Sequence, residues 1–80
     1  MSVAEKVLSI LAAVAGTCEV QENPDLPLFE LAVLDSLKTV EVMIALSEEF
    51  GVEISPAAFE RDQWATPNRI VADMERRLRP

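Results

Sequence analysis

Residues 34–51 read LDSLKTVEVMIALSEEFG and contain the strongest structural signal in the sequence. Asp35 or Ser36 stands in the N-cap position of a helix, where a short polar side chain accepts a hydrogen bond from a backbone N–H of the first turn. Apolar side chains then recur at helical spacing, and Gly51 occupies the position that commonly ends a helix. The spacing predicts that one face of this helix is buried, through Val40, Met43, Ile44, Leu46 and Phe50.

Two more helices are predicted on either side of this stretch. Ser2 and Glu5 form a capping box that opens a helix over residues 3–15, and Gly16 ends it. Thr66 followed by Pro67 is a cap and a first-turn proline, so a last amphipathic helix begins there. Its charged side chains form two pairs at i,i+4 spacing, Asp73 with Arg77 and Glu75 with Arg79.

The connecting segments are less regular. Residues 17–34 show no clean helical period and contain Pro24 and Pro27, so we expect a long loop whose apolar side chains pack across the core. Residues 52–54 alternate like a strand, but no second strand is available to pair with them, so they are predicted to form an extended connector. Ser55 and Pro56 are expected to open a short turn of helix that ends near Glu60. The prediction is one all-α domain over residues 1–80, a four-helix bundle with three main helices, one short helix and a long first loop.

The composition excludes several classes of function. The 80 residues include 14 acidic and 7 basic side chains, one cysteine and no histidine, which gives a net charge of -7. We therefore expect no disulfide, no metal site, and no catalytic residues of the Ser-His-Asp kind. An acidic chain is repelled by nucleic acid, and the apolar runs are shorter than the roughly 20 residues of a membrane span, so neither partner is expected. No signal peptide is visible, and we expect a monomer in the cytoplasm.

Four further side chains are interpreted as structural. Trp64 is the only tryptophan and is predicted to anchor the core, where Met43 and Met74 fill space. Cys18 has no basic neighbour in the sequence that would lower its pKa, so we expect an inert, partly buried thiol.

Ser36 is the residue with the clearest chemical potential. No histidine is present to activate its hydroxyl, and Lys38 should stay protonated, so any reaction there requires another enzyme. The positive end of the helix dipole favours a phosphate ester at this position. The spacing alone leaves two interpretations open, a helix cap and a modified serine.

The motif around Ser36 resembles the signature of carrier proteins that bear phosphopantetheine. The similarity rests on Leu34-Asp35-Ser36-Leu37, on Thr39-Val40-Glu41 and on the run from Ala45 to Ile54. The resemblance implies an acyl-carrier-like bundle, without enzymatic activity, that holds an acyl or aminoacyl group as a thioester on 4′-phosphopantetheine. It implies that a phosphopantetheinyl transferase attaches this arm to Ser36, and that Asp35 lies near the transferase's metal and basic residues. An adenylating ligase or acyltransferase would load the arm, and a downstream enzyme would accept the cargo.

A finer resemblance covers nearly the whole chain and includes the segment from Arg61 to Asn68, which contains Trp-Ala-Thr-Pro. In these segments the chain is similar to the free-standing D-alanyl carrier proteins, which implies D-alanine or another amino acid as cargo. It departs from them at residues 32–33 and 37–38. These departures keep open a discrete carrier of a polyketide or nonribosomal pathway.

The acidic side chains predict a docking surface on the helix that follows Ser36. Residues 1–60 hold 11 acidic and 2 basic side chains, whereas residues 61–80 hold 3 and 5. Steered, short-lived contacts with several enzymes need charges around an apolar centre. We expect these contacts at Leu37, Lys38, Glu41, Val42, Glu48 and Glu49. The rival from another class is an unmodified acidic adaptor that binds a basic partner.

Overall fold

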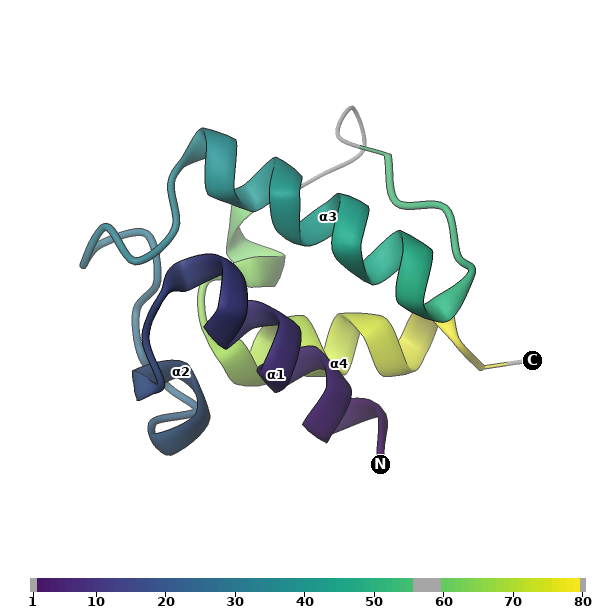
Figure 1. The fold of residues 1–80 in the computed structure, drawn as a ribbon, viewed down its shortest axis with the longest axis horizontal. Helices are drawn as coiled ribbons and strands as arrows, with labels where there is room; N and C mark the ends of the chain where they lie inside the picture. The colour runs from purple at the N-terminus through teal and green to yellow at the C-terminus, as the bar shows by residue number, and fades with distance from the viewer. Residues whose placement is uncertain (1, 56–59, 80) are drawn as a thin grey trace.

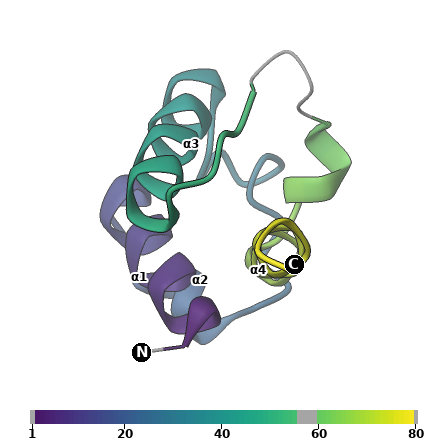
Figure 2. The same cartoon turned by 90° about the vertical axis from the view of Figure 1, so that its right-hand side faces the viewer.

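The computed structural model describes residues 2–55 and 60–79, and every regular element in them is a helix. The order is α1 (Val3–Ala15), α2 (Glu19–Glu22), α3 (Ser36–Phe50), the 3-10 helix η2 (Arg61–Trp64) and α4 (Pro67–Arg77). Helix α1 packs against α2, α3 and α4, and η2 packs against α4. Figures 1 and 2 show α1 next to both of the other long helices, α3 and α4. The predicted all-α fold with three main helices is confirmed.

The helix ends follow from the capping residues. Ser2 Oγ accepts a hydrogen bond of 3.1 Å from Glu5 N, and Thr66 Oγ1 accepts one of 3.2 Å from Arg69 N. Gly16 closes α1 at φ 74°, in the left-handed region where a side chain on Cβ is disfavoured. The three long helices therefore begin where the caps predict, and α1 and α3 end where Gly16 and Gly51 predict.

The first loop is packed, as expected, but it contains a helix that the sequence did not predict. Helix α2 begins after Thr17, whose hydroxyl accepts a 3.2 Å hydrogen bond from Glu19 N. Four residues are too few to show a helical period, which explains why α2 was missed. Val20 on this helix is fully buried, and it ties the loop to the core.

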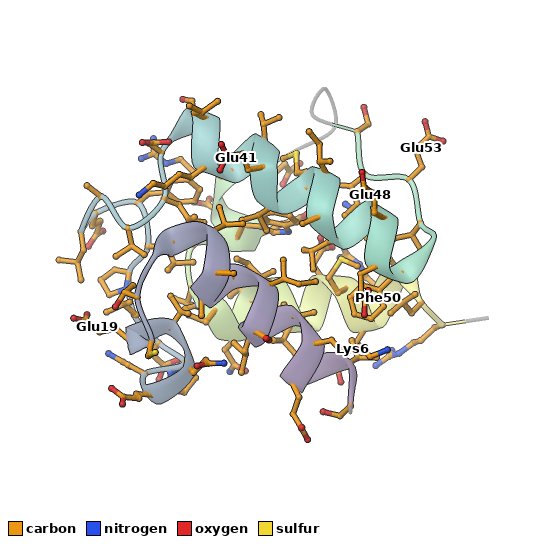
Figure 3. The ribbon with its side chains drawn as sticks, in the orientation of Figure 1. Lys6, Glu19, Glu41, Glu48, Phe50 and Glu53 are labelled. Carbon is orange, nitrogen blue, oxygen red and sulfur yellow. The ribbon has the colours of Figure 1, made fainter. Side chains whose placement is uncertain are left out.

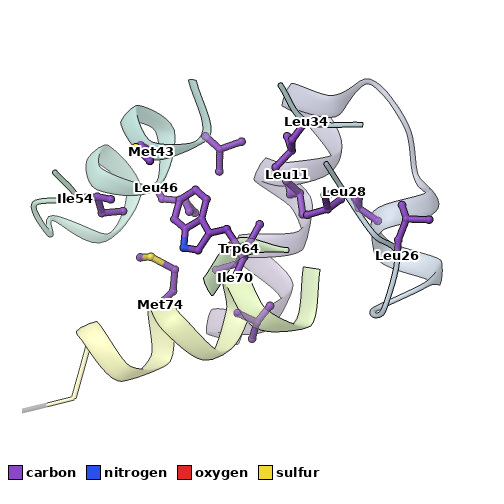
Figure 4. Close-up of a cluster of buried hydrophobic side chains, with 14 residues drawn as sticks. Leu11, Leu26, Leu28, Leu34, Met43, Leu46, Ile54, Trp64, Ile70 and Met74 are labelled. Atoms are coloured by element: carbon purple, nitrogen blue, oxygen red, sulfur yellow. The ribbon is translucent and has the colours of Figure 1, made fainter. Parts of the chain in front are cut away.

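The core draws on every helix and on the first loop (Figure 4). Trp64, Met43 and Met74 are buried, as predicted. The buried apolar side chains are Val7, Leu11, Val20, Leu26, Leu28, Leu34, Val42, Met43, Leu46, Ile54, Trp64, Ile70, Val71 and Met74.

The predicted buried face of α3 is partly wrong. Met43 and Leu46 are buried, but Val40 and Ile44 are 38% and 54% exposed, and Val42 is fully buried in their place. Helix α3 carries apolar residues around most of its circumference, so its period does not fix which of them face α1. The rotation of the helix is set by packing instead.

Two further expectations about single segments are tested by the structure. Residues 52–54 form a connector without regular structure, as predicted, and Ile54 points into the core. Cys18 is exposed, which contradicts the expected partial burial; it lies at the N-cap position of α2. The short helix expected after Ser55 falls on residues 56–59, outside the described residues. Helix η2, which follows them, was not predicted.

A buried carboxylate joins η2 to α4. Asp73 is 4% exposed, and its Oδ2 accepts hydrogen bonds from Trp64 Nε1 at 2.9 Å and from Arg77 Nε at 3.0 Å. Arg76 binds the other carboxylate oxygen. Burial alone would raise the pKa of Asp73, but the hydrogen bonds from Trp64 and Arg77 and the charges of both arginines lower it below its ordinary value. The predicted Asp73–Arg77 pair is therefore present, and its carboxylate is buried.

Candidate functional site

Ser36 is exposed at the first position of α3. Asp35 is the N-cap, and its Oδ1 accepts a 2.8 Å hydrogen bond from Lys38 N. Asp35 O also accepts hydrogen bonds from the backbone N–H and the hydroxyl of Thr39, at 2.9 and 2.6 Å. Within the described residues the N–H groups of Ser36 and Leu37 have no acceptor. These two donors and the positive end of the α3 dipole favour an anion on the Ser36 side chain.

The loop before Ser36 is held by backbone hydrogen bonds. Leu28 O accepts from the N–H groups of Val33 and Leu34, at 2.9 and 3.1 Å, which folds residues 28–34 into a compact turn. Ala32 adopts φ 57° within this turn, a left-handed conformation that is uncommon for a residue other than glycine. The side chains of Leu28 and Leu34 are buried. The entry to α3 is thus anchored on both sides of the turn, and Ser36 is presented at a defined place.

A hollow of about 460 Å³ lies beside Ser36, between the turn, α3 and η2. Its walls are largely apolar, and its polar lining comes from Asp35, Ser36, Thr39 and Arg61. Arg61 lies over the ring of Phe29, with the guanidinium carbon 4.6 Å from the ring centroid. Phe29 and Arg61 were not predicted as site residues, because they are 7 and 25 positions from Ser36 and only the fold brings them to it.

Among the residues that the structure describes, nothing around Ser36 is suited to activate its hydroxyl. The cation that lines the hollow is an arginine, which stays protonated and cannot act as a base. The Asp35 carboxylate accepts the capping hydrogen bond from Lys38 N. The site offers an accessible nucleophile and a seat for an anion, and a second protein has to supply the base.

The expected docking residues do not all share one surface. Leu37 is 70% exposed, Glu41 and Glu48 are exposed, and Lys38 is half-buried. Val42 was predicted as part of the apolar centre of the docking surface; this is wrong, because its side chain is fully buried against the core. Glu49 is exposed but lies toward α1, where its carboxylate is 3.7 Å from Lys6 Nζ.

The exposed apolar residues of α3 are Leu37, Val40 and Ile44, and with Glu41 and Glu48 they follow helical spacing from position 37. We call these five residues the outer face of α3. Figure 3 shows Glu41 and Glu48 along this helix, away from Lys6 and Phe50 on the α1 side. Val40 and Ile44 lie three and seven positions after Leu37, a spacing that places all three residues on one face of the helix. From the sequence, Val40 and Ile44 were instead predicted to be buried.

Comparison with known proteins defines the class. The family model described as "Phosphopantetheine attachment site" matches residues 5–74, so this chain belongs to the family of phosphopantetheine-bearing carrier domains. Members of this family carry 4′-phosphopantetheine on a serine and are not themselves enzymes.

A curated relative narrows the comparison. The chain is 43% identical over 75 residues to the D-alanyl carrier protein of Staphylococcus saprophyticus, and the match covers 94% of this chain and 96% of the relative. No helix in residues 2–55 and 60–79 is long and apolar enough to cross a membrane.

Proposed function

We propose that this protein is a discrete carrier that holds D-alanine, or another amino acid, as a thioester on 4′-phosphopantetheine attached to Ser36. The observation that carries the proposal is the exposed Ser36 hydroxyl at the first turn of α3, beside two N–H groups without an acceptor and an open hollow. The relative named a D-alanyl carrier protein supports the cargo, because the similarity runs along almost all of both chains. When bound, the arm supplies the thiol on which the cargo is carried.

Attachment of the arm divides the chemistry between two proteins. The Ser36 oxygen forms a bond to the phosphorus of the pantetheine phosphate in coenzyme A, while the bond from that phosphorus to the nucleotide breaks. The nucleotide leaves with the bonding electron pair as 3′,5′-ADP. The hydroxyl proton goes to a base of the phosphopantetheinyl transferase, since the described part of this chain offers none at the site. We assign Asp35 two roles, as the cap that fixes the first turn of α3 and as the carboxylate next to the transferase's metal.

The outer face of α3 is the proposed docking surface for the transferase, for the ligase that loads the arm and for the enzyme that accepts the cargo. Leu37, Val40 and Ile44 supply an exposed apolar centre, and Glu41 and Glu48 supply the charge that steers basic partners. Lys38, in the first turn, borders this face. Glu49 takes a smaller part, because Lys6 pairs with it. We place this monomeric carrier in the cytoplasm, where coenzyme A and ATP are supplied to these enzymes.

Intact-mass measurement tests the attachment. Incubation with coenzyme A and a broad-specificity phosphopantetheinyl transferase should add the mass of one phosphopantetheine group to the protein. Ser36→Ala should abolish the gain, and Ser9→Ala, at an exposed serine of α1, should keep it. An unchanged wild-type mass, or a gain that survives Ser36→Ala, contradicts the proposal and favours the unmodified adaptor.

The cargo is tested on the modified protein. A D-alanine ligase with ATP should add one alanyl group to the thiol, and hydroxylamine should release it, as expected for a thioester. Preferential loading by the adenylating or acyltransferring enzymes of secondary metabolism, with no uptake of D-alanine, would instead identify the carrier of another pathway.

The docking surface is tested by charge reversal. Glu41→Lys with Glu48→Lys should raise the KM of the ligase for the carrier at low salt while helix content stays the same. Glu19→Lys with Glu22→Lys is the matched control, since these exposed residues lie on α2 and the net charge changes equally. Equal KM values for the two variants would argue against recognition through α3.

A further inference from the structure

The Arg61 side chain lines the hollow beside Ser36, and among the described residues the N–H donors of its guanidinium have no acceptor. It lines the hollow together with Ser36, and its guanidinium lies 4.6 Å from the centroid of the Phe29 ring. Within the described residues the Arg61 guanidinium takes part in no hydrogen bond and no ion pair. Stacking on a ring engages the face of the guanidinium plane and leaves its N–H donors free along the edge.

Three of the other arginines in the described chain differ from Arg61. Arg76 and Arg77 bind the carboxylate of Asp73, and Arg69 donates to Asp62 O at 2.9 Å. Arg61 is exposed, so the stack on Phe29 fixes the position of its charge without neutralising it. A cation that is positioned and has no acceptor is suited to an anionic ligand.

The charge balance of the hollow identifies where such a ligand would lie. Asp35 and Arg61 are the charged residues that line it, one acid and one base. A phosphodiester on Ser36 adds a second negative charge close to the Asp35 carboxylate. The two N–H groups at the start of α3 offset part of this charge, and Arg61 is the cation that faces the same space.

The dimensions of the hollow agree with this arrangement. Ser36 and Arg61 both line this hollow of about 460 Å³, which is large enough to hold a phosphate. The apolar walls, among them Leu34, Val40 and Met43, would contact the dimethyl group that follows the phosphate in pantetheine.

We propose that Arg61 is a positioning residue for the prosthetic arm: its guanidinium binds the phosphodiester on Ser36 through paired N–H donors, and the Phe29 ring holds it in place. The inference rests on the proposed attachment at Ser36. In this arrangement the root of the arm is ordered over the hollow, while the thiol end is left to reach partner enzymes. The function of Arg61 is thus to set the direction in which the arm leaves the protein.

The experiment compares the apo and modified proteins by nuclear magnetic resonance. The side-chain Nε–Hε resonance of Arg61 should shift when the arm is attached, and the matching resonance of Arg69 should not. The ³¹P line of the phosphodiester should narrow in Arg61→Gln, because the root of the arm gains motion. Loss of an ion pair at an exposed site should reduce the bound population about two- to five-fold. Arg61→Lys should restore part of the order, because it keeps the charge but not the paired donors.

Two variants serve as controls. Arg69→Gln removes the same charge from a neighbouring arginine that does not line this hollow, and it should leave the ³¹P line unchanged. Phe29→Leu keeps Arg61 but removes the ring, so the line should narrow to an intermediate extent. Unchanged Trp64 fluorescence shows that each variant keeps its fold.

The outcomes separate this inference from the proposed function. A protein that carries the arm on Ser36, but in which the Arg61 resonance and the ³¹P line are insensitive to attachment and to Arg61→Gln, overturns the role of Arg61 alone. An equal effect of Arg69→Gln also overturns it, because a general change of field would then suffice. A protein that takes up no phosphopantetheine contradicts the proposed function, and this inference with it.

Discussion

Replacement of Asp73 by alanine should destabilise the protein far more than its place on a charged C-terminal helix suggests. The change removes the acceptor of the 2.9 Å hydrogen bond from Trp64 Nε1, and Trp64 is only 1% exposed. A buried donor left without an acceptor costs about 1–3 kcal/mol. Arg76 and Arg77 retain some exposure and can be rehydrated, so they add less. We expect a loss of about 2 kcal/mol after the better helix propensity of alanine is included.

That loss is large for a chain of this size. Domains of this length have unfolding free energies of roughly 0.05–0.15 kcal/mol per residue, or about 4–12 kcal/mol in total for 80 residues. With 4–8 °C per kcal/mol, the melting temperature should fall by about 8–16 °C. Thermal unfolding followed by far-ultraviolet circular dichroism measures this shift. Urea unfolding followed by Trp64 fluorescence gives the free energy independently.

Two comparisons make the Asp73 result interpretable. Asp73→Asn keeps an oxygen acceptor for the Trp64 N–H and should lose about half as much stability. Glu75→Ala changes an exposed acid two positions away and should cost less than about 0.5 kcal/mol. If Asp73→Ala and Glu75→Ala lowered the melting temperature equally, the buried network would not contribute as described.

Four other outcomes are expected. Because the pKa of Asp73 is lowered in the fold, its contribution to stability is present above the ordinary value of 3.8 and is lost as pH falls below it. The urea midpoint should therefore fall more steeply with decreasing pH for the wild type than for Asp73→Asn. Asp35→Ala should cost about 1 kcal/mol through the lost cap, and Asp35→Ser should recover most of it in thermal melts. Ala32→Gly should raise the free energy of unfolding by up to about 1 kcal/mol, because the left-handed conformation is strained for alanine, and the melting temperature should rise with it; a decrease would refute the argument. Val42→Lys should unfold the protein, whereas Ile44→Lys should leave its circular dichroism spectrum unchanged and weaken binding to the ligase.

The helix boundaries were predictable because they depend on local chemistry. The cap at Ser2, the cap at Asp35 and the Thr66-Pro67 pair each act within one turn, so the sequence contains all the information required. Gly16 and Gly51 end α1 and α3 for the same reason. The place of Ser36 at the start of α3 was predictable on the same basis, whereas its proposed role as the attachment residue came from the resemblance of its motif to carrier proteins.

The rotation of α3 and the surroundings of Ser36 were not predictable in this way. Val40 and Val42 have the same side chain, and only the position of α1 decides that Val42 is buried and Val40 exposed. In the sequence Asp73 is an ordinary helix charge, and only the structure shows that Trp64, nine positions away, donates a hydrogen bond to it. Arg61 joins the site through the packing of η2. Such contacts between distant positions are fixed by tertiary packing, which a single sequence does not reveal.

The hydrogen bonds that join the first loop to the start of α4 have a consequence for recombination between related carriers. Leu28 N donates to Ala65 O at 2.9 Å, and Asn68 N donates to Pro24 O at 3.0 Å. Two segments about 40 positions apart are therefore joined by backbone hydrogen bonds. A chimera that exchanges only one of these segments separates parts that fit each other, and it shifts the turn that presents Ser36. Functional grafts should therefore move residues 23–35 and 60–68 as a pair, even though a single crossover in the connector near residue 53 would look harmless in an alignment.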